Sequence, residues 1–235
     1  DLSDIIIDTR GGGFTRGGFA IDKSSEPELP PWQFAFANAV MGTLLTQYSA
    51  GYTWYVNAAE SKITQRHTDY VKTLAGERLI LRAGGSLYDL CACAARVDYN
   101  FGYAVYKGEI NSLSYEVRIG LDEKLPVKLI SVNAEGGSFN NVEVIYTAAP
   151  DSSSLYSAYA SQREVLFKPV FGGTGVISSL RAVSGRVLYG FDVTRGYVWA
   201  SVSADMSANG TLDCAFMLVS APAASAEMCF SHINS

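Results

Sequence analysis

Apolar and polar residues alternate along several stretches of the chain, most clearly between residues 181 and 219. A period of two places successive side chains on opposite faces of a β-strand. The pattern predicts three strands in this stretch, separated by turns at 194–196 and 205–210, that pair as an antiparallel meander. We expect its inward face to be mostly buried in one sheet, and the residues on that face are Val187, Tyr189, Phe191, Val193, Leu212, Cys214, Phe216 and Leu218.

Shorter stretches predict further strands. They are either alternating or apolar, and Pro, Gly, Asn or Asp residues bound most of them. The stretches are 78–82, 99–105, 113–119, 127–132, 142–146 and 164–167. Together with the meander they bring the expected total to about nine strands. Residues 88–95 fit a helix and a strand equally well.

Two segments near the start of the body show a different spacing, with apolar residues four positions apart. Such residues lie along one side of a helix. The first set predicts a helix over 32–49 and consists of Trp32, Phe36, Val40, Leu44 and Tyr48. The second predicts a helix that ends at Gly76 and includes Tyr55, Ala59, Ile63, Tyr70 and Leu74. The predicted fold class is therefore α+β and β-rich: a mostly antiparallel sheet or sandwich with two N-terminal helices packed on it.

Glycine and proline divide the chain. Residues 1–31 contain five glycines between positions 11 and 18 and end in a proline-rich connector. Glycine costs entropy to order, and proline favours an extended backbone. We expect a flexible Gly/Pro-rich arm over 1–31, free in solution or ordered on another chain, and a single globular domain over 32–235.

Composition narrows the range of partners. Charged residues make up only 17% of the 235, and the formal net charge is −5. A low-charge surface suits contact with other protein, whereas an acidic chain has no general electrostatic attraction to nucleic acid or an anionic membrane. No apolar run reaches the length of a membrane-spanning helix. The start at Asp1 suggests processing, trimming or excision from a longer chain.

The four cysteines favour free, mostly buried thiols over a disulfide framework, because a chain of this length does not need cross-links. The two histidines have no ligand-type residues at metal spacing, so no metal site is expected. These features fit a soluble protein, either in a reducing cytoplasm or as part of a viral particle.

One local segment, residues 155–170, resembles mono-ADP-ribosyltransferases through Gln162-Arg163-Glu164-Val165-Leu166. The resemblance implies that Glu164 stabilises the cationic ribose as nicotinamide leaves NAD, and that Gln162 positions the acceptor. It also implies an NAD-binding arginine on an early strand, which would be Arg82, and a Ser-Thr-Ser strand, for which Ser131-Val132-Asn133 is the nearest match. NAD would then be the cofactor.

The leading functional hypothesis is a non-enzymatic structural protein, without a cofactor, present in many copies in a larger assembly such as a viral capsid. It rests on the low charge, the abundant Tyr and small residues, the arm and the lack of a complete catalytic set. Its partners would be other protein subunits, including copies of itself. The alternatives are an NAD-dependent mono-ADP-ribosyltransferase or an inactive relative of that fold, and a carbohydrate-binding β module that uses exposed Tyr197 and Trp199 rings.

Overall fold

The computed structural model describes residues 4–9, 11–23, 31–66, 76–137, 139–151, 157–168, 176–183, 186–206 and 210–222. These residues form nineteen strands and one short helix. The strands of the first half are β1 (Ile7–Thr9), β2 (Gly12–Phe14), β3 (Gly18–Asp22), β4 (Gln33–Ala37), β5 (Met41–Thr46), β6 (Ser49–Tyr55), β7 (Glu77–Ala83), β8 (Ser86–Asp89), β9 (Arg96–Asn100) and β10 (Tyr103–Ile110). The remainder are β11 (Leu113–Leu121), β12 (Val127–Gly136), β13 (Asn141–Ala148), β14 (Ser157–Ala160), β15 (Val165–Lys168), β16 (Val176–Val183), β17 (Arg186–Asp192), β18 (Tyr197–Asp205) and β19 (Thr211–Pro222), and the helix is α1 (Leu90–Cys93).

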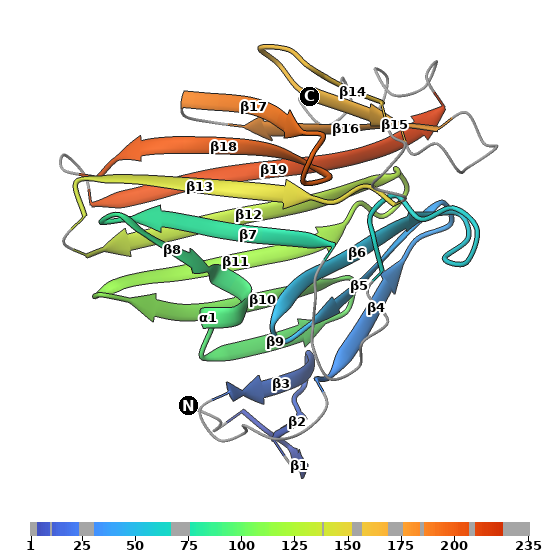
Figure 1. Ribbon diagram of the computed structural model, residues 1–235. Coiled ribbons are helices and arrows are strands. Elements are labelled where there is room, and N and C mark those ends of the chain that lie inside the picture. The colour runs from blue at the N-terminus through green and yellow to red at the C-terminus, as the bar shows by residue number, and fades with distance from the viewer. Residues whose placement is uncertain are drawn as a thin grey trace.

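The strands form three antiparallel sheets, as Figure 1 shows. The large sheet has eleven strands in the order β1-β2-β3-β9-β10-β11-β12-β19-β16-β15-β14. The small sheet lies across it, with the order β17-β18-β13-β7-β8, and the third sheet is β4-β5-β6. The predicted β-rich fold, a mostly antiparallel sheet or sandwich, is therefore confirmed, but the expected total of about nine strands is wrong, since the described residues form nineteen.

The core lies between the large and small sheets. Val117 and Ile119 of β11 are fully buried, whereas Arg118 between them is exposed on the opposite face. From the small sheet, Tyr146 of β13 meets Phe216 of β19 with 5.9 Å between ring centroids. Burying one such side chain contributes roughly 1.5–3 kcal/mol, so this interface is a main source of stability. We call the face of the large sheet that points away from the core its outer face.

The predicted meander is divided between two sheets. β17 and β18 pair in the small sheet, whereas β19 pairs with β12 and β16 in the large sheet. The β19 residues of the predicted inward face are buried, but Phe191 is 40% exposed and Val193 62% exposed. β17 is the edge strand of the small sheet, so less of the protein covers it. The prediction of one buried sheet is wrong for this strand.

The helix predicted over 32–49 is also wrong, because this segment forms β4, β5 and the start of β6. A spacing of four is a multiple of two, so it places side chains on one face of a strand as well as of a helix. Phe34 and Phe36 of β4 show the strand period, since both are partly buried and Ala35 between them is exposed.

The second predicted helix is not found in its described part. Residues 57–66 form a loop that makes two isolated β-bridges, and residues 67–75 lie outside the described ranges. In 88–95, where helix and strand were both open, β8 ends at Asp89 and α1 follows. Asp89 caps this helix by accepting a hydrogen bond from the Ala92 amide. No helix in the described residues is long and apolar enough to cross a membrane.

Part of the segment expected to be a flexible arm lies in the large sheet. β3 pairs with β9, and β2 joins it to β1. Phe19, Ala20 and Ile21 are buried, and the Phe19 ring contacts those of Trp32 and Phe34. These contacts within one chain offset the entropy of ordering the glycines. A domain boundary at residue 31 stays a prediction.

The thiols agree with the sequence expectation as far as they are described. Cys91 and Cys214 are buried and free, and Cys93 is exposed and free. Burial raises the pKa of the Cys214 thiol to about 12, so this thiol stays protonated and behaves as a small apolar group. Cys229 lies outside the described residues.

Candidate functional site

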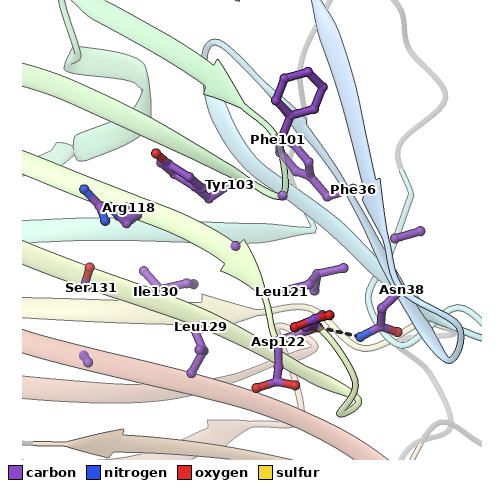
Figure 2. Close-up of a pocket in the computed structure, with 15 residues that line it drawn as sticks. Phe36, Asn38, Phe101, Tyr103, Arg118, Leu121, Asp122, Leu129, Ile130 and Ser131 are labelled. Carbon is purple, nitrogen blue, oxygen red and sulfur yellow. Dashed lines mark hydrogen bonds between the residues drawn. The ribbon is translucent and has the colours of Figure 1, made fainter. Parts of the chain in front are cut away.

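A cleft of about 710 Å³ opens on the outer face of the large sheet (Figure 2). Five parts of the chain form it: the end of β4 and the residue after it, the β9–β10 turn, the end of β11 with the turn that follows, part of β12, and part of β19. Its lining residues are Phe36, Ala37, Asn38, Phe101, Gly102, Tyr103, Arg118, Gly120, Leu121, Asp122, Glu123, Leu129, Ile130, Ser131 and Ala215. We call it the aromatic cleft.

The strand register explains why this part of the sheet is hollow. Tyr103 pairs with Gly120, Arg118 with Ser131, and Ser131 with Ala215, so these side chains share the outer face. The floor therefore consists of Gly, Ser and Ala, while larger side chains stand around it. A Cβ added at Gly120 would approach the Gly102 carbonyl oxygen to 3.0 Å, so a side chain at this position would crowd the floor.

Phe101 marks the mouth of the aromatic cleft. Its side chain is 90% exposed at the tip of the β9–β10 turn, where Asn100 pairs with Tyr103. Gly102 completes this two-residue connection with a φ of 86°, a left-handed conformation that favours glycine. The sequence predicted a continuous strand over 99–105, which is wrong at this turn. A tight turn holds the Phe101 ring in water, where its faces are open to contact with a ligand.

A chain of ion pairs borders the floor. The Arg118 guanidinium lies 5.0 Å from the centroid of the Tyr103 ring, a cation–π contact. Arg118 Nη2 lies 3.7 Å from Glu116 Oε1, and Glu116 Oε2 lies 3.6 Å from Lys107 Nζ. All three side chains are at least one-third exposed, so water competes for each contact. Their donors and acceptors are therefore accessible to a polar ligand.

Asn38 fixes one wall of the aromatic cleft. Its amide nitrogen donates to the carbonyl oxygens of Asp122 and Leu125, both at 2.8 Å. Its Oδ1 accepts from the backbone amides of Val40 and Met41, also at 2.8 Å. Figure 2 shows Asn38 pointing from the third sheet toward the turn after β11. The side chain thus ties the third sheet to the large sheet and sets the width of the cleft.

Within the turn after β11, the Asp122 side chain forms hydrogen bonds with backbone amides of the same turn. Its Oδ1 accepts from the amides of Lys124 and Leu125 at 2.9 and 2.7 Å. Glu123, the neighbouring carboxylate, is exposed at the rim. The cleft thus combines aromatic faces, one guanidinium and two carboxylates. Rings can cover the apolar face of a ligand while the polar groups form hydrogen bonds with its hydroxyls.

A second polar cluster lies in the core and serves a different purpose. Lys128 Nζ lies 2.6 Å from Glu77 Oε2, and neither side chain is exposed. Lys128 also donates to Thr43 Oγ1 and to the Ala50 carbonyl. The Glu77 carboxylate accepts from the hydroxyls of Thr53, Thr64 and Tyr146. The cluster joins strands of all three sheets, and because it is closed to solvent we assign it a structural role.

Glu164 and Gln162, the predicted catalytic residues, lie between β14 and β15. The Glu164 carboxylate accepts from the Ser179 hydroxyl and from Arg181, whose Nε and Nη2 are each at 2.9 Å. Gln162 is exposed in the connecting turn. Neither residue lines the aromatic cleft. The contacts of Glu164 are those of a carboxylate that fastens β15 to β16.

Arg82 and Ser131, the predicted NAD-binding residues, lie on different sheets. Arg82 is on β7 of the small sheet and pairs with Glu143 at 2.7 Å. Ser131 is on β12 of the large sheet, in the floor of the aromatic cleft. The fold therefore does not gather the four predicted residues in one described cleft. Ser131 alone contributes to the candidate site, and the sequence named it for a different reason.

Tyr197 and Trp199, proposed for a carbohydrate-binding module, lie on the outer side of the small sheet and are partly exposed. The Trp199 ring lies flat on the sheet, where a Cβ at Gly190 would be 2.4 Å from its Cζ2 atom. The rings that line the aromatic cleft are Phe36, Phe101 and Tyr103 instead. Sequence reasoning missed them because it treated Phe101 and Tyr103 as strand residues. The usable signal was Phe101-Gly102, a turn pair inside an otherwise alternating stretch.

The fold and the cleft define a two-layer antiparallel β domain with a potential ligand site on the outer face of its larger sheet. The model of the glycosyl hydrolase 94 supersandwich domain family matches residues 19–151, more than half of the chain. The chain belongs to this family.

Solved structures show the same fold at low identity. The chain resembles a bacterial glucoamylase in complex with acarbose, with a TM-score of 0.52 and 11% identity over 86% of this chain. It spans 35% of the glucoamylase chain. It also resembles a putative aldose 1-epimerase from Escherichia coli K12, with a TM-score of 0.51 and 7% identity, over 81% of this chain and 99% of the epimerase. A comparison with curated protein sequences found no match.

Family membership corrects two sequence-based hypotheses. A glycosyl hydrolase supersandwich domain is not a mono-ADP-ribosyltransferase, so the assignment to that family from the segment around Glu164 is wrong. The hypothesis of a capsid or other virion protein is also wrong, because the chain belongs to a glycosyl hydrolase supersandwich domain family. Of the three hypotheses, the carbohydrate-related one agrees with the family.

Proposed function

We propose that this chain is a carbohydrate-binding domain of a larger glycoside-processing protein, and that the aromatic cleft is its sugar-binding site. One observation carries the proposal: the Phe101 ring is 90% exposed at the mouth of a largely apolar cleft that also contains the polar side chains of Arg118 and Glu123. A pyranose ring has an apolar face of C–H groups and a rim of hydroxyls. An aromatic ring beside hydrogen-bonding groups matches both features.

Charge supports a neutral ligand. The lining contains one basic residue, Arg118, and two acidic residues, Asp122 and Glu123. A phosphorylated or otherwise anionic ligand would meet more negative than positive charge. The hydroxyls of a neutral sugar can donate to the carboxylates and accept from the guanidinium, so the mixed set favours them.

We propose binding rather than cleavage in this domain. Hydrolysis of a glycosidic bond generally uses two carboxyl groups that flank it. Asp122 already accepts two backbone hydrogen bonds that hold its own turn, so Glu123 remains as the more accessible carboxylate of the cleft. The family name and the glucoamylase with acarbose associate this fold with proteins that process sugars. The domain would hold or present a glycan for chemistry elsewhere.

Calorimetric titration of the purified chain tests this proposal, using acarbose and a panel of neutral disaccharides as probes. A ligand that covers one face of the Phe101 ring gains about half of the free energy of burying the whole ring. Phe101→Ala should therefore lower the affinity roughly tenfold. Tyr159→Ala is the matched control, because Tyr159 is an exposed aromatic residue on β14, outside the cleft. The proposal fails if no probe binds, or if both variants lose equal affinity.

A further inference from the structure

A second cleft of about 610 Å³ lies on the same outer face as the aromatic cleft. Four neighbouring strands, β10, β11, β12 and β19, contribute to both. Its outward-facing lining residues are Lys107, Ser114, Glu116, Asn133, Glu135, Thr211 and Asp213. We call it the polar cleft.

The two clefts lie on consecutive rows of the sheet. Arg118, Ser131 and Ala215 form a row across β11, β12 and β19 in the aromatic cleft. The next row of the same face contains Glu116 and Asn133 and lies in the polar cleft. Rows two residues apart are separated by about 7 Å, so the clefts adjoin and no loop from the lining stands between them. The ion pair between Arg118 and Glu116 crosses the boundary.

The chemistry of the polar cleft selects a ligand class. Its outward side chains are hydroxyls, an amide, an ammonium and three carboxylates, with no aromatic ring among them. Acidic residues outnumber Lys107, which disfavours anions. In the described residues no group of three or more His, Cys, Asp or Glu could hold a metal ion. A neutral molecule with many hydroxyls is the ligand that such a set can satisfy.

The joined clefts are longer than one sugar. Gly120 in the aromatic cleft and Glu116, which shares a row with Asn133 and Asp213 in the polar cleft, are four residues apart on β11, which is about 13 Å along the strand. A monosaccharide cannot reach both ends. We infer that the outer face binds a neutral oligosaccharide, with one end stacked at Phe101 and the other hydrogen-bonded by Asn133 and Asp213 in the polar cleft. This inference rests on the proposed function of the aromatic cleft.

Titration with a series of one linkage, from monosaccharide to tetrasaccharide, tests the inference. In the wild type, affinity should rise with length. Asn133→Ala with Asp213→Asn should lower tetrasaccharide affinity about tenfold through lost hydrogen bonds and leave disaccharide affinity unchanged. Phe101→Ala should lower both. Side-chain amide signals in nuclear magnetic resonance spectra provide a readout without substitution: Asn133 should shift with the tetrasaccharide and not with the disaccharide.

The outcomes separate the two proposals. If no sugar of any length binds, the proposed function and this inference both fall. If sugars bind, but the disaccharide and tetrasaccharide bind equally well and Asn133 does not shift, the aromatic cleft remains the binding site and the inference falls. If the double variant lowers disaccharide affinity as much as tetrasaccharide affinity, the polar cleft has no separate part of the ligand and the inference also falls.

Discussion

The protein places oppositely charged side chains together in two regions that differ in burial, in the distance between the charges and in hydrogen bonding. In the core, Lys128 and Glu77 are completely buried, 2.6 Å apart, and hydrogen-bonded by four side-chain hydroxyls and a carbonyl. On the outer face, Lys107, Glu116 and Arg118 are separated by 3.6 and 3.7 Å and are exposed to water. The same chemical groups are closed to ligands in one region and accessible to them in the other.

The difference shows how burial decides the role of a charge. A buried ion has lost its water and depends on its partners, so the core cluster holds its strands in one arrangement. An exposed ion pair is screened and contributes little to stability. Each side chain of the pair can therefore leave its partner and bind a ligand at a small cost in free energy. Stability should therefore respond to substitutions in the core cluster, and sugar binding to substitutions on the outer face.

The largest effect is expected for Lys128→Met. The substitution leaves the Glu77 carboxylate buried without its cation, which should lower the free energy of unfolding by about 3–5 kcal/mol. Lys107→Met is the matched control, since it removes the same charge from an exposed position, and should change stability by less than about 0.5 kcal/mol. Denaturant unfolding monitored by circular dichroism measures both. Values for the two variants within 1 kcal/mol of each other would contradict the comparison.

A smaller loss is expected for Tyr146→Phe, which removes one hydroxyl from the Glu77 carboxylate and keeps the ring against Phe216. Burial and the neighbouring carboxylate raise the pKa of the Tyr146 phenol well above its ordinary value, so it acts as a donor. Losing a hydrogen bond to a charged group should cost about 1.5–3 kcal/mol. The same unfolding experiment checks this, and an unchanged midpoint would show that water or another donor replaces the hydroxyl.

Lys23 is partly buried, so its exposure lies between those of the two regions, and its titration should make stability depend on pH. Its ammonium donates to the Cys91 and Ala92 carbonyls, and burial lowers its pKa from 10.5 to about 8. Between these values the unfolded chain binds more protons than the folded chain, so this group makes stability rise with pH from about 8 to 10.5. Other groups titrate there too, so the difference between wild type and Lys23→Met isolates it. A difference independent of pH over this range would refute the prediction.

The smallest change in stability is expected for Glu116→Gln on the outer face. It breaks ion pairs with Lys107 and Arg118 that water already weakens, so the free energy of unfolding should change by less than about 0.5 kcal/mol. Oligosaccharide affinity should fall, because Glu116 contributes to the polar cleft. A stability loss as large as that of Lys128→Met would mean that the exposed chain is structural. Combined thermal unfolding and titration measure both quantities.

Local patterns predicted much of the strand content correctly. The alternation over 113–119 corresponds to β11, where Leu113, Val117 and Ile119 are fully buried and Arg118 is exposed. The apolar run at 78–82 corresponds to β7, which ends at Ala83 and is followed by Gly84 and Gly85 with positive φ values. In these stretches the period of two and the turn residues are local properties, and tertiary contacts reinforce them.

The candidate site could not be predicted in the same way. Its residues come from β4, the β9–β10 turn, β11, β12 and β19, so it exists only after strand order and register are set. Lys128 shows the same limit, because its sequence neighbours are those of an ordinary strand and its partner Glu77 is fifty-one residues away. Gln162 and Glu164, chosen from a short segment, and Arg82 and Ser131, chosen to complete the same family resemblance, also depended on a fold that the chain does not have.

The sequence alone determines the β-rich character of the protein, the positions of many strands, and the inward and outward faces of the regular strands. These follow from the sequence because side-chain direction in a strand depends only on neighbouring residues. Tertiary structure decides the rest. It makes 32–49 into strands, because a spacing of four fits both periods and only the partner strands distinguish them. It assigns β18 and β19 to different sheets, and it places Arg118 beside the Tyr103 ring, because cross-strand register joins residues that the sequence separates.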